Sequence, residues 1–422
     1  MDPRKITTGD MMHTYGCFGA GVDYTVRTTV RLSTHVDIGR LQRAIRMTAG
    51  RYPYFCVRLR NGETSYYYED NPLPIKLSHT DDRIRLNSPE TNHHVWSVCC
   101  NEDRIHLDFF HGITDETGIY TVLSTLLYYY GVECGTVKSP GNILTAEVPI
   151  GAGEVSDPLD AMGKDARNVN DMAEAEEAFS LKTDGNLTPA PATLWDIVIP
   201  EKEFIPFTSA NDASPGTMVS LLLARAIDRL YPDRKKKIVS AYVINARPML
   251  EAAPNSHNCL SMAFFPYSDR IKKLPFSTQC TVYRGMTILQ SDKERVAALM
   301  TENARQIQSA KDGAKTLEEK KRVFGQMFNG GEGIVTFLVS YVGQWKYPAV
   351  ADPIREIWIH PAPTFDLMAE MSAAGGNICL TIQQRFKEDS VREMFLKELD
   401  ENGISYDLKQ VIAADNAFFS EP

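Results

Sequence analysis

The chain has 422 residues, of which 43% are apolar and 23% are charged, and its formal net charge is −9. Such a composition is typical of a folded globular protein long enough for two domains, and it excludes an intrinsically disordered chain. The negative charge argues against nucleic acid and anionic membrane surfaces as partners, and no apolar run approaches the roughly 20 residues of a membrane span.

The beginning of the chain and its cysteines bear on the cellular compartment. Polar residues follow Met1, so we expect no signal peptide. The cysteines are scattered and form no C-x-x-C motif; they are Cys17, Cys56, Cys99, Cys100, Cys134, Cys259, Cys280 and Cys379. Reduced thiols of this kind are typical of a cytoplasmic protein, which is the localisation that we expect.

The first part of the chain predicts a small unit of strands and one helix. The expected elements, in chain order, are a strand over residues 24–32, a helix from Asp37 to about Gly50, a strand over 51–59 and a strand over 65–68. Asp37 is a favourable N-cap residue for the helix. The Asn61-Gly62 pair between two strand-like runs is a strong signal for a hairpin.

The stretch over residues 104–118 changes from a strand period to a helix period just after His111. The alternating apolar residues that predict the strand are Ile105, Leu107 and Phe109. His111 continues their parity, so we expect it at the end of the buried face. From Asp115 on, apolar residues recur at helical spacing, and Gly131 is the expected C′ residue of this helix.

An imidazole at the junction of a strand and a turn is partly shielded from water, and a general base can act from such a position. The same spacing would also suit a histidine that only packs, and Asp115 would also suit a helix cap. The pattern alone therefore leaves a catalytic and a structural interpretation of this junction open.

The composition changes at residues 150–192, where an acidic, alanine-rich segment lies between stretches that contain proline and glycine. It predicts an exposed helix or loop that joins two halves, and we place the two domains at residues 1–175 and 176–422. The elements expected beyond it are a helix after Ser214, a strand over 237–245, a mainly extended segment over 274–287, a helix over 292–310, strands over 334–342 and 377–382, and a helix after Ser390. Both halves alternate strands and helices, so the expected fold class is α/β.

Motifs of several other enzyme classes are missing from the sequence. There is no G-x-S-x-G, no P-loop and no G-x-G-x-x-G. His93 and His94 have no further metal ligand at a useful spacing, and the same holds for His257 near Cys259. We therefore expect no metal site and no bound cofactor. The basic cluster at residues 234–237 is expected to be a solvated loop.

His111 and Asp115 form an H-x-x-x-D sequence, which resembles the motif of an acyltransferase superfamily. That superfamily includes chloramphenicol acetyltransferase, nonribosomal peptide condensation domains, plant BAHD acyltransferases, wax ester synthases and alcohol acetyltransferases. Phe110 replaces the first histidine of the fuller H-H-x-x-x-D-G form and Glu116 replaces its glycine, whereas Gly118 remains. Other segments that resemble the family, in the same order, are 51–58, 243–250, 339–343 and 375–386. The D-F-G-W-G motif of condensation domains and BAHD enzymes has no clear counterpart.

The resemblance implies two chloramphenicol-acetyltransferase-like subdomains of mixed sheet flanked by helices, arranged as a V with a central channel. It also implies an acyltransferase that moves an acyl group from a thioester to a hydroxyl or amine of a small-molecule acceptor. His111 would be the general base, and Asp115 would be a structural residue that pairs with an arginine, for which Arg247 is the candidate. The residues expected to line the substrate channel are Gly112, Ser340 and Tyr341, and a packing role for Tyr341 is equally open.

The co-substrate would be acyl-CoA or the phosphopantetheine thioester of an acyl carrier protein. We expect acyl-CoA, because carrier proteins are usually acidic and this chain is net negative too. The phosphates of coenzyme A need only a few cations, such as Lys272, Lys273 or Arg284. Two alternatives stay open. Glu116 in place of glycine favours a catalytically inactive condensation-like scaffold or carrier-protein docking module, and the same histidine could instead activate water in a thioester hydrolase.

Overall fold

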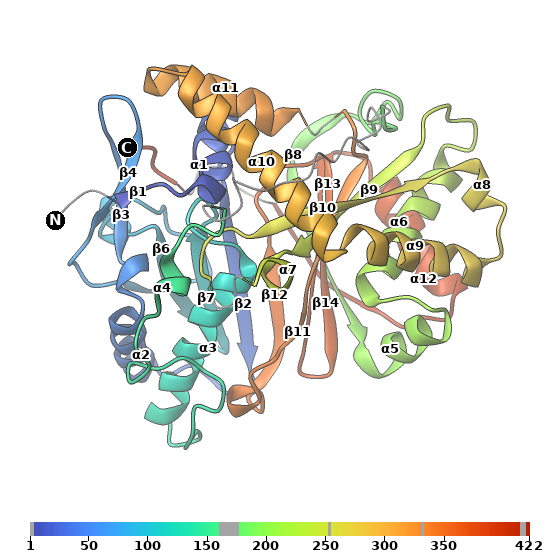
Figure 1. The fold of residues 1–422 in the computed structure, drawn as a ribbon. Helices are drawn as coiled ribbons and strands as arrows, with labels where there is room; N and C mark the ends of the chain where they lie inside the picture. The colour runs from blue at the N-terminus through green and yellow to red at the C-terminus, as the bar shows by residue number, and fades with distance from the viewer. Residues whose placement is uncertain (1–3, 160–176, 252–254, 331–332, 414–418) are drawn as a thin grey trace.

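The computed structural model describes residues 4–159, 177–251, 255–330, 333–413 and 419–422. Within these residues the chain forms two α/β halves that lie side by side, the first coloured blue to green and the second green to red (Figure 1). Each half has a mixed sheet, and helices pack against both sheets. The fold class expected from the sequence is therefore confirmed.

The sheet of the first half has five strands in the order β12-β2-β7-β6-β5. Their bounds in that order are Ile354–His360, Thr25–Leu32, Arg104–Phe110, Trp96–Asn101 and Leu77–His79. Neighbours are antiparallel except for the parallel pair β5–β6. The other elements of this half are β1 (Arg4–Lys5), α1 (Thr8–Ala20), α2 (Ile38–Arg51), β3 (Val57–Asn61), β4 (Tyr66–Asp70), α3 (Glu116–Glu133) and α4 (Ala152–Val155).

The sheet of the second half has seven strands in the order β10-β9-β11-β13-β14-β8-β15. Their bounds in that order are Leu260–Tyr267, Ile238–Asn245, Phe337–Gln344, Leu367–Ala374, Asn377–Phe386, Pro189–Pro200 and Asp407–Ala413. The helices are α5 (Glu201–Ala210), α6 (Pro215–Leu230), α7 (Arg247–Leu250), α8 (Asp269–Lys272), α9 (Phe276–Gln290), α10 (Lys293–Gly313), α11 (Leu317–Asn329) and α12 (Ser390–Glu401). The central strands β9, β11 and β13 run parallel to one another.

Several elements of the second half join it to the first, among them α11, whose Phe324 belongs to the core of the first half. β12 leaves the second half and pairs with β2, so the first sheet draws strands from both proposed sequence domains, 1–175 and 176–422. α10 runs in front of the junction between the halves (Figure 1). Ile354, Ile357 and Ile359 of β12 belong to the core of the first half, so this crossing strand is held by burial as well as by hydrogen bonds.

Several local predictions are confirmed. Asp37 caps α2 by accepting a hydrogen bond from the N–H of Arg40. The β3–β4 hairpin pairs Asn61 with Tyr66, and the turn between them contains Gly62. The helix that follows the histidine is α3, and its N-cap is Asp115.

Other local predictions are wrong. The segment expected to be mainly extended over 274–287 is helix α9, because its buried side chains, Gln279, Cys280 and Tyr283, recur at helical spacing after Pro275. Gly131 is not a C′ residue but lies inside α3, where a Cβ would come within 2.4 Å of Val137 Cγ2. The glycine therefore serves a close approach of the following chain.

The two expected loops also differ from the prediction. Part of the joining segment 150–192 lies outside the described residues, and its end belongs to strand β8. In the cluster expected to be a solvated loop, Lys235 and Lys237 are exposed, whereas the side chain of Arg234 is buried and forms an ion pair of 2.8 Å with Asp228. No helix among the described residues has both the length and the apolar character needed to cross a membrane.

Candidate active site

His111 lies in the turn directly after β7 and is only 5% exposed. Its backbone N–H donates to the carbonyl of Tyr24, just before β2, at 2.9 Å. Its own carbonyl accepts a hydrogen bond of 2.8 Å from the side-chain amide of Asn258, which lies just before β10. Because one bond comes from each half of the molecule, the position of His111 depends on how the two halves are joined.

Two aromatic rings fix the plane of the imidazole. The Tyr24 ring stacks on it at a centroid distance of 4.5 Å and an angle of 17°, and the His13 ring stacks at 5.0 Å and 28°. His111 Nε2 lies 3.5 Å from Glu116 Oε1, and Nδ1 is buried with no hydrogen-bond partner among the described residues. Burial and the charge of His111 lower the pKa of His13 to about 3, so that neighbour stays neutral.

Asp115 points away from the imidazole toward the second half, where its carboxylate meets Arg247. The two oxygens accept bonds of 2.8 and 2.9 Å from Nη2 and Nη1 of Arg247, in a bidentate pair. They also accept bonds from the N–H groups of Gly118 and Cys259, each at 3.0 Å. Asp115 is fully buried and Arg247 is 4% exposed, so the carboxylate joins the start of α3 to the second half out of contact with water.

The arginine makes further contacts that extend this junction. Arg247 donates to the backbone carbonyls of Asn255 and His257, at 2.8 and 2.6 Å. Burial alone would lower the pKa of Arg247, but the charge and the hydrogen bonds of Asp115 outweigh it and raise the pKa. The pair expected between Asp115 and Arg247 is thus present, and its importance for activity stays a prediction.

A second buried carboxylate supports the same loop. Asp10 of α1 accepts hydrogen bonds from the side chains of His257, at 2.7 Å, and Asn258, at 2.7 Å. Burial would raise the pKa of Asp10, but the charge and hydrogen bond of His257 lower it overall. The loop that holds the carbonyl of His111 is therefore itself held by two carboxylates, Asp10 and Asp115.

His111 lies on the wall of a cavity of about 390 Å³. Side chains of both halves line it: His13, Tyr24 and Glu116 come from the first half, and Ser340, Met368 and Glu370 from the second. Most other lining side chains are apolar. The cavity can therefore shield a reacting centre from water while offering a few polar groups beside the imidazole.

Of the three residues expected to line the substrate channel, Gly112, Ser340 and Tyr341, only Ser340 is among the residues that line the cavity. Ser340 lines the cavity from β11 and lies opposite Glu370 in the β11–β13 ladder. Tyr341, the next residue, points to the other face of the strand and packs against the core of the second half, where burial raises its pKa to about 12. Gly112 is not among the lining residues; its carbonyl accepts hydrogen bonds from Thr14 and Tyr68.

Two carboxyl groups stand beside the imidazole. Glu116, the first residue of α3, has a side chain that is 12% exposed, and Glu370, in the middle of β13, is 5% exposed. Burial raises the pKa of both, and the charge of Glu116 raises that of Glu370 further, to well above its ordinary value. Among the described residues neither forms an ion pair with a lysine or arginine.

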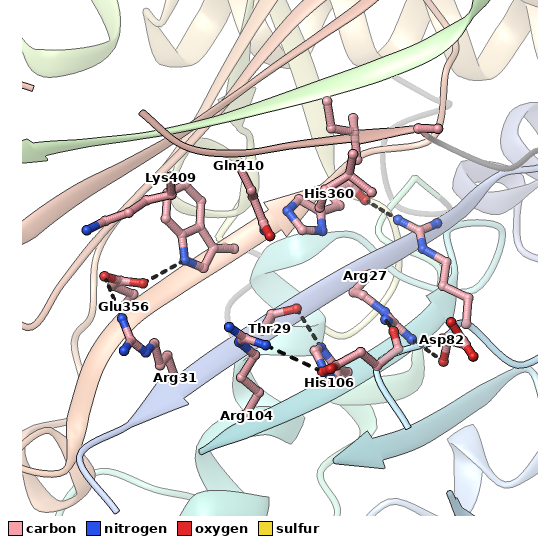
Figure 2. A pocket seen from close by; sticks show the side chains of 16 residues that line it. Arg27, Thr29, Arg31, Asp82, Arg104, His106, Glu356, His360, Lys409 and Gln410 are labelled. Atoms are coloured by element: carbon pink, nitrogen blue, oxygen red, sulfur yellow. Dashed lines mark hydrogen bonds and ion pairs between the residues drawn. The ribbon is translucent and has the colours of Figure 1, made fainter. Parts of the chain in front are cut away.

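A larger cavity of about 620 Å³ lies on the other face of the first sheet (Figure 2). It is polar, but its charged groups satisfy one another. Arg27 forms a bidentate pair with buried Asp108, with both bonds at 2.8 Å. His106 bonds Thr29 and Asp81, and burial lowers its pKa to about 4. Since His111 does not line this cavity, we assign the chemistry to the smaller one.

Sequence reasoning missed four residues of the site: His13, Tyr24, Asn258 and Glu370. The first three contact His111 but lie far from it in the sequence, and no local sequence pattern predicts such contacts. Glu370 did carry a signal, because it is the one acid in β13, whose eight residues are all buried. No group of three or more metal-ligating side chains occurs among the described residues, including those near His93 and His257.

No protein-family model and no curated protein sequence matches the chain. Solved structures do match. Polyketide synthase associated protein 5 from Mycobacterium tuberculosis has a TM-score of 0.64 at 12% identity, over 94% of this chain and 98% of that one. F. graminearum TRI101, complexed with coenzyme A and T-2 mycotoxin, has a TM-score of 0.62 at 10% identity, over 96% of this chain and 100% of that one.

The condensation domain from Monacolin K polyketide synthase MokA has a TM-score of 0.64 at 11% identity, over 95% of this chain and 97% of that one. The chain therefore has the two-subdomain fold of condensation domains and of the acetyltransferase TRI101. The fold implied by the sequence resemblance is confirmed over nearly the whole length, and at these identities the likeness is one of fold.

We predict that Asp115→Asn lowers the thermal midpoint as well as any activity. The substitution leaves Arg247 buried without its counter-charge, which costs about 3–5 kcal/mol. Thermal and denaturant unfolding measure the effect. The matched control is Asp212→Asn, at a half-exposed ion pair with Arg284, where we expect a loss of less than about 1 kcal/mol. Equal stability of Asp115→Asn and the wild type would contradict the buried role of the pair.

We also predict that Glu370→Gln stabilises the protein above about pH 4.5, the ordinary pKa of a glutamate. The folded state keeps its proton at Glu370 to higher pH than the unfolded state does. Wild-type stability should therefore fall relative to the variant as pH rises, by up to about 1.4 kcal/mol per pH unit. Denaturant unfolding of both proteins from pH 4 to 8 measures the difference, and parallel curves would refute the raised pKa.

Proposed function

We propose that the protein is an acyltransferase that moves an acyl group from a thioester to the amine or hydroxyl of an acceptor, with His111 as general base. The observation that carries the proposal is the placement of His111. Its backbone is held at both the N–H and the carbonyl, and its ring lines a mainly apolar cavity built by both halves. The fold shared with TRI101 and condensation domains supports the same class of reaction.

In this mechanism the acceptor and the thioester meet in the cavity beside His111. The imidazole takes the proton of the acceptor as its oxygen or nitrogen attacks the thioester carbonyl carbon. The tetrahedral oxyanion then collapses, the carbon–sulfur bond breaks, and the leaving thiolate receives the proton from His111. Ser340, which lines the same cavity from the second half, is the proposed hydrogen-bond donor to the oxyanion. No covalent enzyme intermediate is required.

Asp115 has a positioning role in this proposal. Both of its oxygens are engaged by Arg247 and backbone N–H groups, so it does not touch the reacting atoms. It keeps the start of α3 against the loop that carries Asn258. In this way the carboxylate fixes the carbonyl of His111 without taking part in proton transfer.

The proposed donor is an acyl-CoA. The cations expected from the sequence to bind the phosphates of coenzyme A do not line this cavity. Lys272 pairs with Asp228 and Arg284 pairs with Asp212, and Lys273 is also absent from the lining residues. Arg295 of α10 does line the cavity and is exposed. We therefore propose that Arg295 contacts the phosphates at the cavity mouth. TRI101 has been seen in complex with coenzyme A, which supports this choice.

We predict that His111→Ala keeps the fold and lowers acyl transfer by about 10²-fold or more, since the variant lacks the proton acceptor. Thiol release from a panel of acyl-CoA donors measures the rate, and thermal unfolding verifies the fold. His106→Ala is the matched control, because His106 is an equally buried histidine of β7 that lines only the other cavity. Turnover of His111→Ala at the wild-type rate would refute the proposal.

We predict that Arg295→Ala raises KM about tenfold or more for an acyl-CoA donor. The same variant should leave KM unchanged for the N-acetylcysteamine thioester of the same acyl group, which has no phosphates. Steady-state kinetics with the two donors measure the difference. Transfer only from a phosphopantetheinylated carrier protein, with a rate that falls steeply with salt, would instead identify a carrier-protein donor.

A further inference from the structure

The carboxyl groups of Glu116 and Glu370 line the same cavity as His111 and interact with each other, since the charge of Glu116 raises the pKa of Glu370. Glu116 Oε1 lies 3.5 Å from His111 Nε2. Glu370 comes from the opposite wall, where it is paired in register with Ser340, and its Oε2 is buried without a hydrogen-bond partner among the described residues. Both line the same cavity as the imidazole. The cavity therefore presents two acceptors and a negative charge where an acyl acceptor must bind.

Among the described residues, no lysine or arginine forms an ion pair with either carboxyl, and the charges that lower the pKa of Glu116 are those of His111, at 3.5 Å, and Arg247. Arg247 is engaged by Asp115 in a bidentate pair, and the buried His13 stays neutral. Arg295, which lines the cavity from α10, is exposed and forms no ion pair with either carboxyl in the described structure. A buried carboxyl without a counter-charge costs stability, and a cationic ligand removes that cost.

The remaining wall is suited to an apolar body. Five methionines line it, Met12, Met262, Met300, Met327 and Met368, together with aliphatic and aromatic side chains. Methionine side chains are flexible and polarizable, so they adapt to chains of different shape. A ligand that matches the whole cavity has a cationic head beside His111 and an apolar body against the methionines.

We propose that the acyl acceptor is a primary amine on an apolar body, and that Glu116 and Glu370 bind its ammonium group beside His111. This inference rests on the function proposed above and names the acceptor class. An alcohol of the same shape would fill the apolar part but would leave the negative charge of the cavity without a cationic ligand. Glu116, which stands where the related motif has glycine, thus acquires a role in selecting the acceptor.

The bound ammonium gives one proton to the carboxylate of Glu116, which later releases it to solvent. The neutral nitrogen attacks the thioester carbonyl carbon, the nitrogen–carbon bond forms, and His111 Nε2 takes a second proton. The carbon–sulfur bond breaks, and the thiolate takes that proton from His111. The products are an amide, a thiol and one proton.

Binding tests the inference independently of turnover. Calorimetry at pH 7.5 would compare octylammonium with 1-octanol, which has the same chain without the charge. We expect octylammonium to bind wild-type protein at least tenfold more tightly than 1-octanol. Glu116→Gln combined with Glu370→Gln should abolish the preference, and Glu116→Gln alone should reduce it if the double variant does not fold. The matched control is Glu356→Gln, a buried glutamate of the other cavity, which should keep the preference.

Equal affinity for octylammonium and 1-octanol, or an undiminished preference in the glutamine variants, would overturn the inference. Turnover separates this failure from a failure of the proposed function. If an acyl-CoA donor transfers to 1-octanol but not to octylamine, acyl transfer stands and the amine assignment is wrong. If octylammonium binds as expected but no thioester releases thiol in its presence, the cation site stands and the proposed acyl transfer is wrong.

Discussion

The buried ion pair between Asp115 and Arg247 is the interaction on which the rest of the site depends. Two charges removed from water are costly, and attraction repays that cost only when the remaining hydrogen-bonding capacity is satisfied. Here Asp115 accepts four hydrogen bonds, and Arg247 donates to two further carbonyls. The pair thereby fixes the start of α3 in the first half against the 255–259 loop of the second. His111 lies between these two attachments, so a shift of the halves would move the imidazole directly.

The two glutamates that line the cavity of His111 differ from Asp115, because they lack comparable partners for a buried carboxyl group. Asp115 and Asp10 have partners that satisfy them. Among the described residues, Glu370 Oε2 has no hydrogen-bond partner, and Glu116 lies 3.5 Å from His111 without an ion pair to a lysine or arginine. The poorly compensated carboxyls in the cavity therefore lower the stability of the folded protein, whereas the structural carboxylates Asp10 and Asp115 are well paired. Such a contrast is typical of sites where function and stability compete. Under the proposal of an amine acceptor, the same contrast would let an apolar, methionine-rich cavity select its ligand by charge.

Much of this arrangement could be predicted from the sequence, since the relevant signals are local. The alternation in β7 placed His111 at the end of a buried face, and its spacing from Asp115 suggested an acyltransferase-like loop. The pairing of Arg247 with Asp115 could be predicted only from the resemblance to a family, because the two residues are 132 positions apart and no local pattern connects them. His13 and Asn258 had no signal, since their contacts depend on how the halves pack. Tyr341 was named with Ser340, but strand alternation allows only one of the two adjacent side chains to face the cavity.

Chemical rescue of His111→Ala by added imidazole, in single-turnover acyl transfer, tests the proposed role of His111 as general base most directly. If His111 takes the proton of the acceptor and Asp115 only positions it, imidazole should restore a rate that rises with the fraction of neutral imidazole. It should not restore the rate of Asp115→Asn, in which the base is present but misplaced. A folded His111→Ala variant that binds the donor but gains nothing from imidazole would contradict the role of His111. Equal rescue of Asp115→Asn would contradict the division of roles between the two residues.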